Sequence, residues 1–186
     1  MPEPSLRPHS WATPDLQVLV DLFYPNPSEL GQFEEVERGQ VSEPSRTLLA
    51  HHSHMTVSIE DFHGCLVDVE VLRSQQSELH YSREIRLRRQ SDGRIVMYGL
   101  VRLARQLLGE EVYLEIVAQR EPLGRILIRH EVLRNVKLLS LWRVRTGPAL
   151  RAAVELPELE ECFGRTALIY CNGVPAVELV EIAVFP

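Results

Sequence analysis

The sequence predicts a single α+β domain in which helices pack over one face of an antiparallel β-sheet. Its 186 residues favour one domain with one core. Several segments alternate apolar and polar residues as strands do, and two pairs of them are separated by short turn sequences typical of hairpins. Strand and helix candidates do not alternate regularly, which argues against a parallel sheet with crossover helices.

The N-terminal part of the chain is expected to be irregular and helical. Residues 1–12 contain three prolines and little apolar material, so they are expected to fray outside a domain that spans 13–186. A helix is predicted over 13–24, because Thr13 can cap it and the proline that follows suits its first turn. The polar segment 26–45 predicts a loop or partial helix, and a short helix is expected over 44–50.

The sheet is expected to come mainly from the segments after residue 66. The strand candidates are residues 67–72, 80–89, 94–103, 135–146, 165–171 and 174–185. The turn at 91–93 joins one hairpin, and Asn172-Gly173, a strong hairpin signal, joins another. One further helix is predicted over 107–119.

Composition excludes several classes of function. The net charge of −6 argues against a general nucleic-acid-binding surface. Lys137 is the only lysine, so Schiff-base chemistry would have to use it. The three cysteines form no CxxC pair. No apolar run approaches the roughly 20 residues of a membrane span, and the N-terminus does not resemble a signal peptide, so a cytoplasmic protein is expected.

A cluster of histidines falls near the middle of the N-terminal half. Its members are His51, His52, His54 and His63, with Glu60 and Asp61 nearby. Their spacing matches no HExxH-type metal signature. We therefore expect a loop or helix end with at most one functional histidine, and a bound metal is the minority interpretation.

Arg83 lies on the predicted core-facing side of its strand, with Tyr81, Ile85 and Leu87. An arginine on an apolar face must be paired or must serve a ligand, because burying its charge alone is costly. Its planar fork suits a carboxylate. Two interpretations therefore stay open: a ligand carboxylate, or an internal ion pair with one of three glutamates, Glu84, Glu178 or Glu181.

The last strand raises the same question for a carboxylate. Glu178 and Glu181 have opposite parity, so an undistorted strand turns only one of them toward the core. If Glu181 faces inward, Leu179 and Val177 do so too. An inward carboxylate on an apolar strand is either an ion-pair partner or a working acid or base.

Four segments share their order and spacing with a known family. They are LLAHHSHMT (48–56), YSREIRL (81–87), EPLGRIL (121–127) and FGRTALIYCNGVPAVELVEIAVFP (163–186). Together they resemble the chorismate lyase family, from about residue 45 to the C-terminus. The chain departs from the family at His54, which stands in place of a serine, and at Val180, where a threonine is frequent.

The resemblance implies a cofactor-free elimination of pyruvate from chorismate, giving 4-hydroxybenzoate or an isomer. It implies that Arg83 holds a carboxylate and that Glu181 is the catalytic acid or base, with Glu178 as the rival. The other residues it places at the substrate are Met55, Thr56, Leu123, Gly124 and Arg165, with Leu123 and Gly124 in a Pro-Leu-Gly loop. Arg165 would be a second anion partner or a structural arginine.

The same fold also serves as an effector-binding domain in a family of bacterial transcription regulators. A non-catalytic binding domain for a small aromatic acid is therefore the alternative, although the chain shows no helix-turn-helix segment. A metal-dependent enzyme that uses the histidine cluster is a third, weaker hypothesis. The sequence contains no signal for an oligomeric state.

Overall fold

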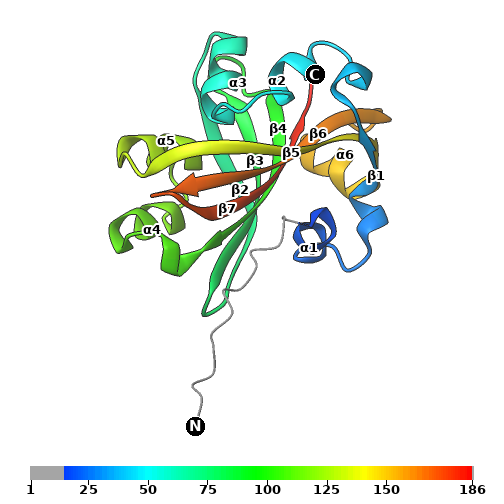
Figure 1. Cartoon of the computed structure of the whole chain (residues 1–186). Helices are drawn as coiled ribbons and strands as arrows, with labels where there is room; N and C mark the ends of the chain where they lie inside the picture. Colours follow the sequence, from blue (N-terminus) through cyan, green and yellow to red (C-terminus); the bar gives the residue numbers. More distant parts are fainter. Residues whose placement is uncertain (1–14, 186) are drawn as a thin grey trace.

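The computed structural model describes residues 15–185, the side chains of Leu133 and Arg134 excepted, and confirms an α+β fold with one antiparallel sheet (Figure 1). Seven strands run in the order β1-β5-β6-β7-β4-β3-β2, and every neighbouring pair is antiparallel. The strands are β1 Gly31–Val36, β2 Val67–Gln76, β3 His80–Arg89, β4 Ile95–Ala104, β5 Leu133–Thr146, β6 Glu161–Cys171 and β7 Val174–Ala183.

Both predicted hairpins are present, and the turn of each contains at least one residue with positive φ. Gly93 has φ 71° in the turn between β3 and β4. In the turn between β6 and β7, Asn172 and Gly173 have φ 52° and 84°. Positive φ at both central residues matches the right-handed twist of the flanking strands. These turns bring β3, β4, β6 and β7 together at the centre of the sheet.

Most helices cover one face of the sheet. On that face are α2 Ser45–Leu49, α3 Met55–His63, α4 Glu110–Val117 and α5 Leu123–Arg129. Their apolar side chains pack on Ile85, Val101 and Leu179 of the sheet. Two short helices cover part of the opposite face in a second apolar cluster: α1 Leu16–Asp21, which lies within the helix predicted over 13–24, and α6 Pro148–Val154, which was not predicted. Single 3₁₀ turns occur at Pro27–Glu29, Arg38–Gln40 and Arg105–Leu107.

Several local predictions differ from the structure. Asp15 caps α1 by accepting from the Gln17 amide at 2.9 Å, while the predicted cap, Thr13, and the expected frayed segment 1–12 lie outside the described residues. β1 falls in the segment predicted as loop or partial helix. It is an edge strand paired only with β5 and buried mainly at its two ends, so its sequence lacks a clear alternation.

On the face opposite most helices, Glu84 is a buried carboxylate with three donors. Tyr98 donates to it at 2.7 Å, Arg73 at 2.5 Å, and the Tyr24 hydroxyl completes the set. Burial, followed by the hydrogen bond to Glu84, raises the pKa of Tyr24 to about 12. The carboxylate thus connects β3 with β2, β4 and the end of the α1 segment.

We expect Glu84→Ala to lower the free energy of unfolding by about 3 kcal/mol, because it removes the acceptor that two buried hydroxyls and the exposed Arg73 share. Urea denaturation measures the loss. Glu34→Ala is the control, since Glu34 pairs with Arg143 at an exposed site, and it should change stability by about 0.5 kcal/mol or less. Equal losses in the two variants would contradict this role for Glu84.

Candidate functional site

A cavity of about 40 Å³ lies between the sheet and the first turns of α3 and α5. Its floor comes from five strands, β3 to β7, and its roof from residues 54–56 and 122–124. Residues of the floor include Ile85, Gly99, Val101, Ile169, Leu179 and Glu181. All four segments that resemble chorismate lyase contribute to the lining of this cavity, and YSREIRL (81–87) does so through Ile85 and Leu87.

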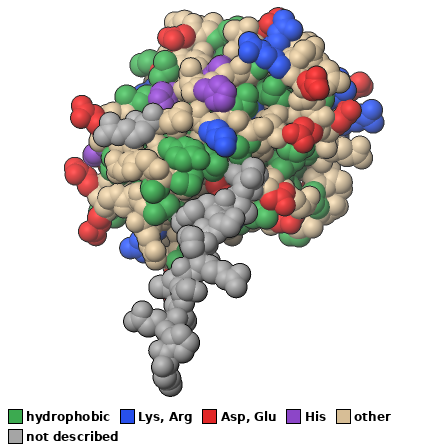
Figure 2. Space-filling view, viewed as in Figure 1, with side chains coloured by type: hydrophobic (Ala, Val, Ile, Leu, Met, Phe, Trp, Pro, Cys, Tyr) green, Lys and Arg blue, Asp and Glu red, His purple; other side chains and the backbone are tan. Residues whose placement is uncertain are grey.

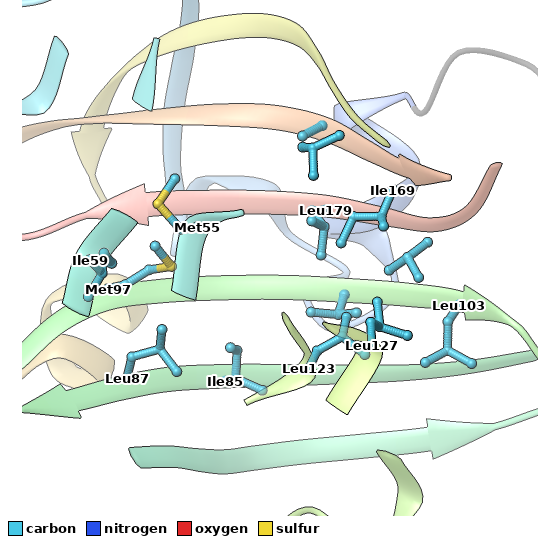
Figure 3. Close-up of a cluster of buried hydrophobic side chains, with 14 of the residues drawn as sticks. Met55, Ile59, Ile85, Leu87, Met97, Leu103, Leu123, Leu127, Ile169 and Leu179 are labelled. Atoms are coloured by element: carbon cyan, nitrogen blue, oxygen red, sulfur yellow. The ribbon is translucent and has the colours of Figure 1, made fainter. Parts of the chain in front are cut away.

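The cavity is apolar in its middle and has two methionine side chains near one end. Met55, Met97 and Leu87 lie at one end of the surrounding cluster, and Leu123, Leu127 and Leu103 lie at the other (Figure 3). An apolar cavity that admits benzene measures about 150 Å³, so the walls must move apart to take an aromatic ring. The two methionine side chains suit such a rearrangement, because their unbranched thioethers repack readily.

Glu181 belongs to a row of paired residues that crosses the cavity floor. Ile85, Gly99, Glu181 and Arg165 are successive partners on β3, β4, β7 and β6. Gly99 carries no side chain, so the middle of this row does not project from the sheet. A Cβ there would lie 3.3 Å from Cγ1 of Ile85. The sequence did not single out Gly99. Its position between a cavity wall and Glu181 leaves room for a flat group.

The strand register places Glu181, not Glu178, on the cavity face. Leu179 and Val177 face the same way, as the parity argument requires. Glu178 points to the opposite side and pairs with Arg102, with Nη2 and Oε1 2.9 Å apart. Glu181 is therefore the carboxylate that a ligand in the cavity could reach.

Arg165 is fully buried and uses its donors inside the protein. Its Nε donates to Oε2 of Glu181 at 2.6 Å, and Nη1 donates to the His51 carbonyl at 3.0 Å. Longer contacts of 3.5 Å reach the carbonyls of Leu49 and Ser53. The side chain thus holds the 49–53 turn, which leads into α3 and the cavity roof. This geometry fits the structural interpretation of Arg165 better than that of a free anion receptor.

Arg83 is also fully buried, but its guanidinium makes almost no hydrogen bonds within the described residues. Its only hydrogen bond among residues 15–185 is a long one, 3.5 Å, from Nη1 to the Ile116 carbonyl of α4. Nε and Nη2 have no partner within the described part of the chain. Burial lowers the pKa of Arg83, and the nearby hydroxyl of Tyr81 opposes this effect. An arginine in this state can gain strongly from a carboxylate.

The three glutamates that could have neutralised Arg83 internally are all paired elsewhere. Glu84 bonds to Arg73, Glu178 to Arg102 and Glu181 to Arg165. The interpretation of Arg83 as half of an internal ion pair with one of them is therefore wrong. Glu84 also points to the other face of the sheet, as expected for the residue next to Arg83 on a strand.

Arg83 adjoins the cavity without being part of its present lining. It is paired with Val101 and precedes Ile85 by two residues on the same face, and both neighbours line the cavity. Arg83 and Glu181 are two strands apart and two residues out of register, which places their backbones about 12 Å apart. A cation and a carboxylate thus flank an apolar space at opposite ends.

The cavity roof is made by the starts of two helices that pack closely. Neither α3 nor α5 has a side-chain cap on its first amides. A Cβ on Gly124 would lie 2.8 Å from Oγ1 of Thr56, so the glycine permits this approach. The Pro-Leu-Gly segment, predicted as a loop, is the beginning of α5: Leu123 is its first residue. Met55, Thr56, Leu123 and Gly124 all line the cavity.

The histidines are not gathered into one site. His54 precedes α3 and lines the cavity, whereas His51 contacts Arg165, and His63 contacts Arg89 at the other end of α3. The exposed His52 accepts from the Leu138 amide at 3.3 Å. Among residues 15–185 no group of three or more His, Cys, Asp or Glu side chains could hold a metal ion.

The surface of the described residues adds little to the site. On the face shown in Figure 2, acidic side chains are scattered and basic ones form no continuous patch. No helix within residues 15–185 is both long enough and apolar enough to cross a membrane. The cavity is therefore the feature from which a function can be argued.

Comparisons with known proteins give structural neighbours only. No protein-family model matches the sequence. No curated protein matches it either. A domain described as the ligand-binding domain of a GntR-family transcriptional regulator from Bordetella bronchiseptica has 12% identity and a TM-score of 0.49 over 63% of this chain and 85% of that one.

Two further neighbours are domains of repressors. The C-terminal domain of the histidine utilization repressor from Pseudomonas syringae has 10% identity and a TM-score of 0.45, over 63% of this chain and 90% of that one. The effector-binding domain of the Bacillus subtilis trehalose repressor has 12% identity and a TM-score of 0.40, over 62% and 89%. At such low identity, the residues of the cavity have to indicate the function by themselves.

Proposed function

We propose that this protein binds a small aromatic carboxylate in the cavity under α3 and α5, with Arg83 as the partner of the carboxylate. The observation that supports this most directly is the buried guanidinium of Arg83, two of whose nitrogens have no partner among the described residues. A ligand carboxylate would take both donors in the bidentate geometry that arginine favours. The apolar floor beyond it suits a ring.

The far end of the cavity indicates what else the ligand carries. Glu181 and His54 line that end, and both are polar groups in an otherwise apolar wall. A ring with a carboxylate at one end and a hydrogen-bonding substituent opposite it, together with a hydrogen bond of about 2.8 Å at each end, would span a distance similar to the separation of about 12 Å between the two strand positions. Para-substituted benzoates, such as 4-hydroxybenzoate, fit this description.

A second candidate function, elimination of pyruvate from chorismate, is favoured by the position of Glu181. The sequence resemblance assigns the catalytic carboxylate to this residue, and Glu181 lies in the cavity with Arg165 at its side. In that reaction the ring loses the proton on C4, which carries the hydroxyl, the ether bond at the adjacent C3 breaks, and the departing enolpyruvate takes up a proton to become pyruvate. Glu181, held in place by its hydrogen bond from Arg165, would accept the C4 proton. Such general-base assistance typically accelerates a reaction about 10²–10⁴-fold.

One experiment separates binding from turnover. Purified protein, treated with a chelator, is incubated with chorismate while pyruvate and the aromatic product are followed, and 4-hydroxybenzoate binding is measured calorimetrically in parallel. Binding without pyruvate supports the binding function alone. Pyruvate release that Glu181→Gln abolishes and Glu178→Gln retains supports the lyase as well. A protein that shows neither binding nor turnover would contradict both proposed functions. Activity that is restored only by added metal would favour a metalloenzyme instead.

A further inference from the structure

His54 lines the cavity, where a ligand could reach it, and its side chain makes no hydrogen bond within the described residues. It occupies the residue just before α3, yet its side chain caps no helix amide. Its Nδ1 atom is buried and has no hydrogen-bond partner among the described residues. Buried polar atoms of this kind are rare and need an explanation, since each lost hydrogen bond is costly.

The surroundings of His54 restrict what it can bind. Burial first, and then the positive charge of Arg165, lower the pKa of His54, so the ring is neutral near pH 7. With its proton on Nε2, the neutral ring presents a lone pair at Nδ1. Glu181, the other polar group at this end, also accepts hydrogen bonds, and its present donor is Arg165. Two acceptors facing one space favour a ligand group that donates.

We infer that His54 accepts a hydrogen bond from a hydroxyl on the ring, opposite the ligand's carboxylate, and so selects para-hydroxylated aromatic acids over unsubstituted ones. This inference rests on the proposed binding function, because it concerns the far end of the same ligand. Arg83 supplies the anchor that every aromatic carboxylate would share, and His54 supplies the discrimination. His54 lines the cavity and Arg83 adjoins it from β3, so their contributions can be separated.

The test is a set of calorimetric titrations with benzoate, 4-hydroxybenzoate and 4-methoxybenzoate. The wild-type protein should bind 4-hydroxybenzoate about fivefold or more tightly than the other two, as expected for one buried hydrogen bond. In His54→Leu this preference should fall to about one, while benzoate affinity stays within about twofold of wild type. His54→Asn, whose side-chain oxygen can take the place of Nδ1, should restore the preference. His52→Leu is the control and should keep it.

The outcomes distinguish the inference from the function on which it rests. If benzoate binds and 4-hydroxybenzoate keeps its full advantage in His54→Leu, the role of His54 is refuted while the binding function stands. A preference for 4-methoxybenzoate over 4-hydroxybenzoate would show that this end donates instead, which also overturns the inference. If none of the three acids binds to the wild-type protein, the binding function fails and the role of His54 fails with it.

Discussion

Replacing Arg83 with methionine is expected to stabilise the ligand-free protein and to abolish its binding of aromatic carboxylates. The guanidinium is fully buried, and two of its nitrogens have no partner among residues 15–185. Methionine has a similar length, no charge and a flexible shape that fills irregular space. Removing a buried charge that lacks a partner should raise the free energy of unfolding by about 1–3 kcal/mol.

The same substitution should weaken 4-hydroxybenzoate binding by about 2–5 kcal/mol, the usual loss when one partner of a buried charge pair is removed. For a chain of this size the gain in stability corresponds to a rise in melting temperature of about 2–4 °C per kcal/mol. Differential scanning calorimetry without ligand measures the first effect. A lower melting temperature in Arg83→Met would mean that Arg83 stabilises the fold, and would contradict its assignment as a ligand anchor.

Arg165→Met is expected to have the opposite effect on stability, with a loss of about 3–5 kcal/mol. Arg165 lies on the same sheet face and is equally buried, but its Nε bonds to Glu181 at 2.6 Å and its Nη1 to the His51 carbonyl at 3.0 Å. The substitution leaves the carboxylate of Glu181 buried without its partner and releases the 49–53 turn. Urea denaturation of the two methionine variants side by side gives the comparison.

A second substitution checks the cause of that loss. If the penalty comes from the uncompensated carboxylate, Glu181→Leu in the Arg165→Met background should recover about half of the lost stability or more, because the charge is then gone. No recovery would assign the loss to the released 49–53 turn instead. An Arg165→Met protein as stable as wild type would contradict the structural role of Arg165 altogether.

The central part of the sheet could be predicted from the sequence, and its edge and roof could not. β3 is found over 80–89 as predicted, because long alternation and the 91–93 turn determine its limits. Asn172-Gly173 determines the inner ends of β6 and β7, whose outer ends lie at Glu161 and Ala183 and not at the predicted 165 and 185. β1 has a single strand partner and little alternation, so nothing local marks it. α5 begins at a proline-leucine-glycine sequence that is also typical of a loop, and its contact with Thr56 depends on tertiary packing.

The candidate site shows the same limit. Strand parity correctly left one of Glu178 and Glu181 on the core face, but only the register against β4 and β6 identifies it as Glu181. The state of Arg83 depends on where three distant glutamates find their partners, which no local pattern reveals. The sequence identifies His54 as a member of a histidine cluster and as a departure from the chorismate lyase family, whereas only the structure shows that this cavity-lining residue has a buried Nδ1 without a partner among the described residues.

The most direct test of the proposed function is a calorimetric titration of the wild-type protein and Arg83→Met with 4-hydroxybenzoate and with its neutral amide, 4-hydroxybenzamide. The two ligands have nearly the same shape, so they differ mainly in the charge that Arg83 would pair with. We expect the wild type to bind the carboxylate at least about 30-fold more tightly than the amide. In Arg83→Met this preference should disappear. Equal affinities for both ligands in the wild type, or an unchanged preference in Arg83→Met, would contradict a carboxylate site at Arg83.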